Sequence, residues 1–179
     1  YMRVKKADGN PIAIEAEDAT LLGEAEAREN AYASSKGYAS NIEGGTSDAL
    51  TLTVNAPKAG TYKMVIHHSS GELFGGHTYN AQLVDRYASF KLNDLDAKRL
   101  YFKNTYSDSN WRTTVLDVEL EEGENTLSVY NDNWRKVQNG TGETGNITYA
   151  TLVNYTPNFD LFEFYPAVTE NSALTENYK

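Results

Sequence analysis

Apolar and polar residues alternate along several short runs of this chain, and Pro and Gly separate the runs. The clearest stretch is LTLTVNAPKAGTYKMVIHH, residues 50–68. Leu50, Leu52 and Val54 lead into the turn sequence NAPKAG, and the alternation resumes at Tyr62. Because successive side chains of a strand point to opposite faces, this pattern predicts a strand, a turn and a second strand, arranged as a hairpin.

The same plan recurs over residues 112–132, RTTVLDVELEEGENTLSVYND. Leu116, Val118 and Leu120 alternate with polar residues before the turn sequence EEGEN, and Leu127 follows it. This stretch predicts a second hairpin. Further strands are predicted at residues 12–19, 87–94 and 159–166.

Helical periodicity is weak, and only residues 80–88 and 173–179 are plausible short helices. Many short strands separated by turns predict an all-β fold, a β-sandwich of the jelly-roll type. Three stretches without clear alternation are predicted to be long loops, which in a compact domain often carry function. They are residues 25–49, 69–82 and 133–158.

The length of 179 residues predicts about one domain. We assign residues 1–166 to this domain and residues 167–179 to a linker or to the start of a next domain. The hydrophobic fraction of 40%, with 13 Tyr and 6 Phe, argues against disorder. The chain starts without a recognisable signal peptide, so we interpret it as a piece of a longer protein.

The formal net charge of −9 excludes some partners. Nucleic acids and anionic membranes attract basic surfaces, so neither is expected to bind here. The chain contains no Cys, which excludes disulfides, thiolate metal sites and a Cys nucleophile. No apolar run approaches the length of about 18 residues that a membrane-spanning helix requires.

The octet IAIEAEDA, residues 12–19, places two acids in an apolar strand. On a strand Glu15 and Glu17 share one face, roughly 6.6 Å apart along the chain, and would repel each other. A Ca²⁺ ion, which takes about 6–8 oxygen ligands, would turn this repulsion into attraction. The alternative is a solvated strand face with Lys or Arg on neighbouring strands, and the octet alone leaves both open.

An enzyme is a weaker hypothesis. The histidines are His67, His68 and His77, and no GxSxG, HExxH or phosphate-binding glycine loop is present. Glycosidases need two carboxylates about 5–9.5 Å apart, and Glu15 and Glu17 nearly satisfy this distance. Any two acids separated by one residue on a strand do so, which makes the pair a weak indication of catalysis.

Aromatic residues in polar surroundings point to another chemistry. Trp111 lies in SDSNWRTT and Trp134 in NDNWRKV, while Tyr32, Tyr38 and Tyr106 also lie in loop-like sequences. An aromatic ring beside amide and guanidinium groups suits stacking on a sugar whose hydroxyls are hydrogen-bonded. For either Trp alone, the alternative is that the ring covers one end of the sandwich.

Four stretches, taken in order, resemble the carbohydrate-binding modules of families 6 and 35, and family 35 more closely. They are IEAEDA, SSKGYASNIEGG, VNAPKAGTYKMVIHH, and NWRTTVLDVELEEGENTLSVYN followed by PNFDLFEF. The resemblance covers roughly residues 12–165. It implies a non-catalytic β-jelly roll that helps an attached glycoside hydrolase to hold its substrate.

The resemblance also implies a structural Ca²⁺ ion. Its ligands would be Glu15, Glu17 and Asp160, with backbone carbonyls from about residues 34–38. Asp160 stands in the apolar run NFDLFEF, where an unpaired carboxylate would be costly, and this agrees with a metal ligand.

The sugar site implied by the resemblance lies in loops at one end of the sandwich. Tyr38 or Tyr32, together with Trp111 and Asn158, match the family's positions, and Arg112 and Trp134 are further candidates. Residues 69–86 and 135–156 are longer than the family pattern, and the second stretch, which directly precedes Asn158, is expected to reshape or cover the pocket.

We therefore expect a monomeric carbohydrate-binding module of an extracellular, multi-domain bacterial glycoside hydrolase. Its partner would be an oligo- or polysaccharide. The alternative is a structural or adhesion jelly roll that serves as a spacer without binding sugar, and a small enzyme comes third.

Overall fold

A computed structural model gives the fold of this chain. It describes residues 10–42, 45–71, 85–132 and 156–167, and four further strand segments by their backbone. Those segments are β7 (Leu73–Phe74), β8 (Gln82–Leu83), β13 (Lys136–Thr141) and β14 (Ile147–Thr151).

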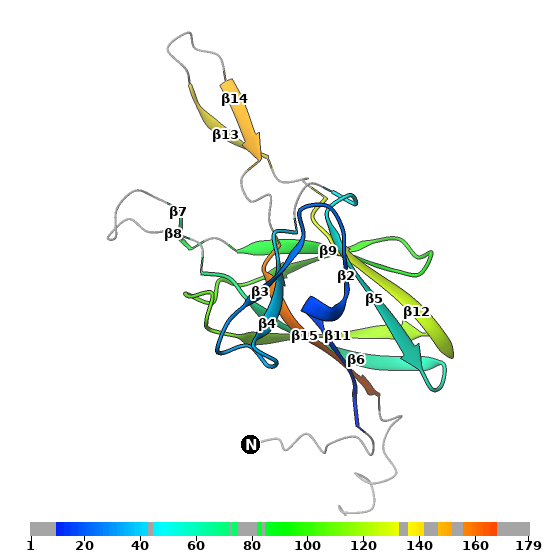
Figure 1. Cartoon of the computed structure of the whole chain (residues 1–179). Helices are drawn as coiled ribbons and strands as arrows, with labels where there is room; N and C mark the ends of the chain where they lie inside the picture. The colour runs from blue at the N-terminus through cyan, green and yellow to red at the C-terminus, as the bar shows by residue number, and fades with distance from the viewer. Residues whose placement is uncertain are drawn as a thin grey trace, which may run out of the picture.

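Two antiparallel sheets pack face to face and form the predicted jelly-roll sandwich (Figure 1). The first sheet contains, in spatial order, β11 (Arg112–Leu120), β6 (Gly60–Ser69), β15 (Asn158–Pro166), β4 (Gly37–Ser40) and β3 (Glu26–Glu29), with β1 (Ile12–Glu15) paired to β15. The second contains β10 (Lys98–Phe102), β9 (Arg86–Leu92), β12 (Gly123–Tyr130), β5 (Ala49–Ala56) and β2 (Thr20–Leu21).

The strands predicted over residues 50–68 and 112–132 are confirmed, but their pairing as hairpins is wrong. β5 pairs with β12 in one sheet, and β6 pairs with β11 in the other. Each turn therefore carries the chain from one sheet to the other. Alternation predicts a strand and which of its faces is buried. It does not predict the neighbouring strand, which depends on the sheet to which each strand belongs.

Two further predictions of local structure are wrong. Residues 80–88 do not form a helix, because β8 and β9 occupy much of this stretch, and β9 is paired on both sides by β10 and β12. The predicted strand over residues 12–19 stops at Glu15, and a 3₁₀ turn, η1 (Ala16–Asp18), follows. Glu15 and Glu17 therefore do not share a strand face. The helix predicted over residues 173–179 lies outside the described residues.

The three stretches predicted as long loops also contain strands. β3 and β4 lie within residues 25–49, and they pair with each other. β7 pairs with β8, and β13 pairs with β14, in two small ribbons outside the sandwich. Such strands are short or lack period-two alternation of apolar residues, which is why the sequence did not reveal them. No helix in the described part of the chain has the length and hydropathy needed to cross a bilayer.

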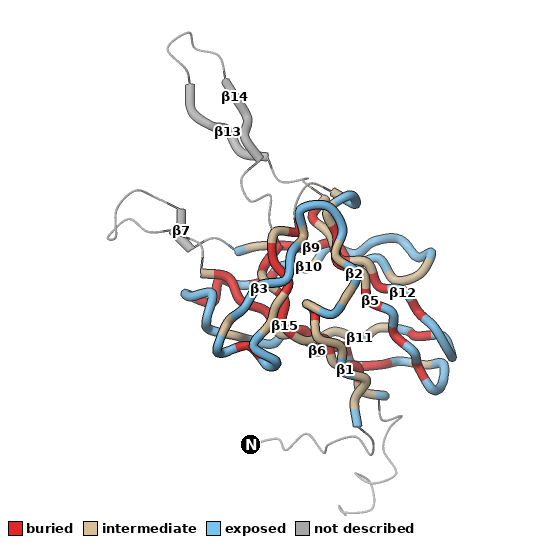
Figure 2. The backbone as a smooth tube through the Cα atoms, in the orientation of Figure 1, coloured by how far each residue is buried: buried red, intermediate tan, exposed pale blue. Residues whose placement is uncertain are grey.

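An aromatic cluster fills the core between the sheets and fixes the start of β15. The Phe159 ring packs at 5.7 Å from Phe102 and 6.2 Å from Phe90, which belong to the opposite sheet. Buried residues lie along the strands of both sheets, as the red segments of Figure 2 show. Burial of these rings from water is the main stabilising contribution, and it holds the polar neighbours of Phe159 in fixed positions.

Candidate functional site

Two polar residues, Asn158 and Asp160, flank Phe159 at the start of β15. Asn158 is aligned with Ser69 of β6, and Phe159 is aligned with His68 of β6 and with Ala39 of β4. The register of β15 against β6 shifts after Phe159. The start of β15 is thus held between β4 and β6, and it contributes to two different sites.

The first site is a pocket with a volume of about 390 Å³. β4 supplies Tyr38 and Ser40, the end of β6 and the next residues supply Ser69, Ser70 and Gly71, and β15 supplies Asn158. The remaining lining residues are Arg28, Asn41, Arg86, Asp108 and Thr156. Hydroxyl, amide and guanidinium groups predominate in this lining, and such groups bond the hydroxyls of a polar ligand.

The Asn158 amide is fixed in orientation by two serines. Ser40 Oγ donates to Asn158 Oδ1 at 2.9 Å, and Asn158 Nδ2 donates to Ser69 Oγ at 3.4 Å. An amide has further donor and acceptor capacity beyond these two bonds. Asn158 therefore presents an oriented amide to the pocket, and sugar binding by this residue stays a prediction.

Tyr38 is the aromatic residue among the described lining of the pocket, and the Trp111 ring packs on it. The two rings meet edge to face with centroids 5.5 Å apart and an interplanar angle of 62°. Trp111 itself does not line the pocket, and its buried Nε1 has no hydrogen-bond partner among the described residues. The structure thus brings Tyr38 and Asn158 together in the pocket, with Trp111 in contact with Tyr38.

Three charged residues of the pocket were missed by the sequence analysis. Arg28 forms an ion pair with Glu26, whose hydrogen bond raises the pKa of the guanidinium. Asp108 Oδ1 accepts a hydrogen bond from the Gly71 N–H at 2.8 Å, and Arg86 lies on β9 of the other sheet. These residues are far apart in the sequence, so no local motif signals their convergence.

The other predicted sugar-binding residues lie outside this lining. Tyr32 is 75% exposed on the loop between β3 and β4. Arg112 is exposed at the start of β11, with its guanidinium carbon 6.0 Å from the centre of the Tyr106 ring. Trp134 falls outside the described residues.

The second site is an acidic cluster, which we define as Glu15, Glu17 and Asp160. Ser34 lies between two of its members. The Ser34 N–H and Oγ lie 2.9 and 2.8 Å from Asp160 Oδ1, and the same Oγ lies 2.6 Å from Glu15 Oε2. A hydroxyl has one proton to donate, so it cannot satisfy both carboxylates at once.

Glu17 completes the cluster from the η1 turn. The Ser35 hydroxyl bonds Glu17 Oε1, while the buried Oε2 has no partner in the described part of the chain. The Gly37 backbone lies directly against this side chain, and a Cβ at residue 37 would be 2.8 Å from Glu17 Cγ. A side chain at residue 37 would displace the Glu17 carboxylate from this position, and glycine leaves room for it.

Burial and mutual repulsion act on this cluster. The pKa of Glu15 is raised, first by desolvation and then by the charges of Glu17 and Asp160, against the lowering effect of the Ser34 hydrogen bond. Asp160 is only 2% exposed. Within the described residues, no three His, Cys, Asp or Glu side chains are close enough to form a metal site by themselves. A cation here would therefore also need backbone or hydroxyl oxygens of the 34–38 loop.

His68, beside Phe159, is a buried neutral histidine. It is 3% exposed, its Nε2 lies 3.1 Å from Thr114 Oγ1, and its ring packs on Phe102 at 4.7 Å. Desolvation, followed by the charges of His67 and Arg112, lowers the pKa of His68 to about 4. His68 is a core residue of the first sheet, and it does not line the pocket.

Comparisons with known proteins identify the family and the fold of this chain. The sequence model described as "Carbohydrate binding module (family 35)" matches residues 12–139. A family 35 carbohydrate-binding module from Clostridium thermocellum is 32% identical and superimposes with a TM-score of 0.67, over 86% of this chain and 97% of that one.

Two curated bifidobacterial enzymes are also similar. A 3-O-β-L-arabinopyranosyl-α-L-arabinofuranosidase of Bifidobacterium pseudocatenulatum is 28% identical over 90% of this chain. A 3-O-α-D-galactosyl-α-L-arabinofuranosidase of Bifidobacterium longum subsp. longum is 27% identical over 94% of it. This chain spans only 19% and 16% of their lengths, so it corresponds to a small part of each of these two enzymes.

The family match covers well over half of the chain, and the solved family member shares its jelly roll. The enzymes contain the similar segment as a small part of a longer chain. This chain therefore belongs to the family 35 carbohydrate-binding modules, which are non-catalytic domains appended to glycoside hydrolases.

Proposed function

We propose that the pocket around Asn158 binds an arabinose- or galactose-containing glycan and holds it near an attached glycoside hydrolase. The observation that carries this proposal is the pocket itself, in which Tyr38 and an oriented Asn158 amide converge. The choice of sugar rests on the names of the two bifidobacterial enzymes, which are an arabinopyranosyl- and a galactosyl-arabinofuranosidase.

Each part of the pocket would make a distinct contact with the sugar. The Tyr38 ring, braced by Trp111, offers an apolar face for the C–H groups of a sugar ring. Asn158 and Asn41 offer amide donors and acceptors for hydroxyls, and Arg28 and Arg86 offer planar sets of N–H donors. A single stacked ring and a few such bonds predict a Kd of about 10 μM to 1 mM.

We also propose that the acidic cluster binds Ca²⁺ as a structural ion. Asp160 and Glu15 compete for the one Ser34 proton, a buried Glu17 oxygen has no partner among the described residues, and the pKa of Glu15 is raised. These observations indicate a site that lacks positive charge. Carboxylates with backbone carbonyls are the oxygen donors that Ca²⁺ prefers, and the ion would join β15 to the loop after β3.

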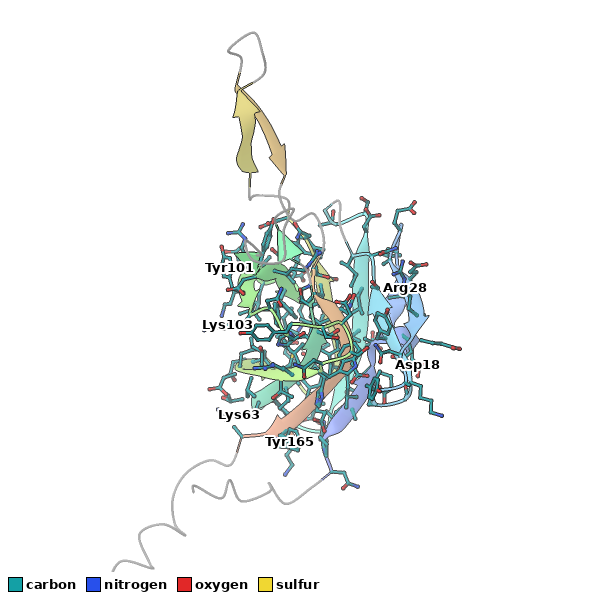
Figure 3. All side chains as sticks on the ribbon, turned by 90° about the vertical axis from the view of Figure 1, so that its left-hand side faces the viewer. Asp18, Arg28, Lys63, Tyr101, Lys103 and Tyr165 are labelled. Carbon is teal, nitrogen blue, oxygen red and sulfur yellow. The ribbon has the colours of Figure 1, made fainter. Side chains whose placement is uncertain are left out.

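The positions of the outer strand ends fit an appended module. β1 starts at Ile12, which is aligned with Phe164 near the end of β15, so both lie away from the Asn158 end of that strand. Figure 3 shows Arg28, which lines the pocket, and Tyr165 at different levels of the sandwich. Flanking domains would thus leave the pocket free, which suits a secreted bacterial hydrolase acting on an extracellular polysaccharide.

Isothermal titration calorimetry with arabinogalactan, β-1,3-galactan and arabinan tests the sugar proposal. Binding to at least one of these glycans, and its loss in Asn158→Ala, is expected. The variant must keep the circular dichroism spectrum of the wild type. A calcium-loaded, folded wild type that binds none of them would favour the spacer alternative.

A further inference from the structure

Tyr106 has an unusual backbone conformation for a large side chain. Its φ of 68° lies in the left-handed region, together with three other described non-glycine residues, Lys36, Asn41 and Asn93. Asn tolerates this region, whereas a bulky residue there carries strain of the kind found at binding and active sites. The surrounding contacts must hold Tyr106 in this conformation.

Those contacts come from a tightly bonded loop between β10 and β11. The Tyr106 N–H donates to Oδ1 of Asn104 at 2.7 Å, and Asn104 is 5% exposed. Thr105 is completely buried, with its N–H bonded to the Ser70 carbonyl at 2.7 Å. Although its neighbours are buried in this way, the side chain of Tyr106 is 65% exposed.

A hydrogen bond from a tyrosine N–H to an asparagine side chain occurs a second time in the described part of the chain. The Tyr32 N–H donates to Oδ1 of Asn30 at 2.9 Å, so Asn-Ala-Tyr and Asn-Thr-Tyr share this hydrogen bond, although only Tyr106 has a positive φ. Tyr32 and Tyr106 are the two most exposed large hydrophobic side chains of the described residues, at 75% and 65%. In both loops an asparagine fixes the backbone of an outward-facing tyrosine.

The two loops contact each other, and one of them contacts the rim of the pocket. Asn30 Nδ2 donates to the Asp108 carbonyl at 3.3 Å and lies 3.2 Å from Ser109 Oγ. The Gly71 backbone packs against Ser107, since a Cβ at Gly71 would lie 2.8 Å from Ser107 Cα. Since Gly71 and Asp108 both line the pocket, the surface runs from it onto the Tyr106 loop and then to the loop of Tyr32.

We propose that Tyr32 and Tyr106 form an outer platform on which sugars beyond the one in the pocket stack. The module would then take an extended oligosaccharide chain rather than a single terminal sugar. This inference rests on the proposed sugar-binding function of the pocket. Exposed tyrosines give a large apolar contact at low entropic cost, and a fixed backbone lowers that cost further. Arg112, with its guanidinium over one face of the Tyr106 ring, steadies the ring and offers hydrogen-bond donors beside it.

Calorimetric titration with a mono-, a di- and longer oligosaccharides of one binding glycan tests the platform. Wild-type affinity is expected to rise with chain length. Tyr106→Ala and Tyr32→Ala are each expected to weaken the longer ligands about tenfold, the loss of one stacked ring, and to leave monosaccharide affinity unchanged. Tyr106→Phe should bind as the wild type does, because the ring is retained.

Tyr101→Ala is the matched control, because Tyr101 is 52% exposed on strand β10 and its ring packs on Tyr87. It should bind every ligand normally. Tyr106→Gly should bind long ligands as weakly as Tyr106→Ala does but have the higher melting temperature of the two, because glycine adopts positive φ without strain.

The outcomes separate the platform from the pocket. If the Tyr32→Ala/Tyr106→Ala double variant binds long and short ligands like the wild type, while Asn158→Ala binds none, the pocket stands and the platform is wrong. If the variants lose the same factor for every length including the monosaccharide, the tyrosines belong to the pocket itself, and the platform is again wrong. A wild type that binds no glycan overturns both proposals.

Discussion

Asn158 and Asp160 stand two residues apart on one strand, yet they serve sites of opposite character. Asn158 is neutral, is held by two serine hydroxyls, and faces an open pocket. Asp160 is charged, almost fully buried, and competes with Glu15 for the proton of Ser34. One site is satisfied by the protein alone, whereas the other brings three acids together without an ion pair to any Lys, Arg or His of the described residues.

This difference predicts that the two sites affect different properties, the pocket affecting ligand affinity and the acidic cluster affecting stability. A satisfied, oriented and accessible amide can exchange water for a ligand without disturbing the fold. A buried cluster of carboxylates costs free energy unless a cation or several donors neutralise it. We therefore expect substitutions at the pocket to change affinity, and substitutions at the acidic cluster to change the free energy of unfolding.

The largest effect is expected from Asp160→Ala. The substitution removes an acceptor of two bonds from Ser34 and, on our proposal, a calcium ligand, so the free energy of unfolding should fall by about 3 kcal/mol or more. Asn158→Ala should cost about 1 kcal/mol or less, because it loses one neutral bond and one long contact. Urea unfolding of both variants in calcium buffer measures the difference.

Equal losses of stability in the two variants would contradict the expected difference between the pocket and the acidic cluster. The same difference would be contradicted if Asp160→Ala abolished sugar binding while the protein remained folded and stable. In that case the acidic cluster, and not the pocket, would hold the ligand.

The next largest effect concerns pH and His68, which is aligned with Phe159 between the two sites. The pKa of His68 is about 4 in the folded protein, below its ordinary value of 6.5. The folded state thus binds this proton less tightly than the unfolded state. The stability contributed by neutral His68 is complete above pH 6.5 and is lost as the pH falls toward 4, by up to about 3 kcal/mol.

Urea unfolding of the wild type and of His68→Phe across this pH range measures the contribution. Phe retains the ring contact with Phe102 but has no titrating group. The difference in unfolding free energy between the two proteins should change with pH in favour of the variant below pH 6.5. A difference that is constant between pH 7 and about 4 would show that His68 is not the titrating group.

Much of the fold was predictable from the sequence, because a strand with one buried face leaves a local pattern of alternating residues. Period-two alternation from Leu50 to Ile66 identified two real strands, because each buries one face. It could not show that β5 pairs with β12 and β6 with β11, because pairing depends on residues distant in the sequence. The turn at Ala16 was also missed, since a single 3₁₀ turn leaves no periodic signal.

The candidate site was predictable only in part. The residues that the family resemblance singled out do lie close together, since Tyr38 and Asn158 line one pocket and the Trp111 ring packs on Tyr38, while their role in sugar binding stays a prediction. Arg28 and Arg86 come from different sheets, so only the folded chain brings them together. The role of Ser34 between two carboxylates was equally invisible, because serine is common in loops and its position in SSKG carries no chemical signature.

The smallest expected effect is that of Glu15→Gln on stability, and its sign is expected to differ between buffers with and without calcium. Without metal, Glu15→Gln should stabilise the protein, because the raised pKa of Glu15 shows that its charge is unfavourable in the folded state. Solvent screens this partly exposed group, so the gain should be below about 1 kcal/mol. In calcium the same variant should destabilise, because a carboxylate ligand of the ion is lost and native-state binding weakens.

The measurement compares melting temperatures in calcium and in chelator. Glu29→Gln is the matched control, since Glu29 is an exposed acid on β3, and it should behave alike in both buffers. A Glu15→Gln effect of the same sign in both would contradict the calcium site. The acidic cluster would then be balanced by the protein itself, and the contrast with Asn158 would disappear. A reversal of sign, confined to Glu15, is the behaviour that a cation between these carboxylates requires, because the same charge is unfavourable without the ion and necessary with it.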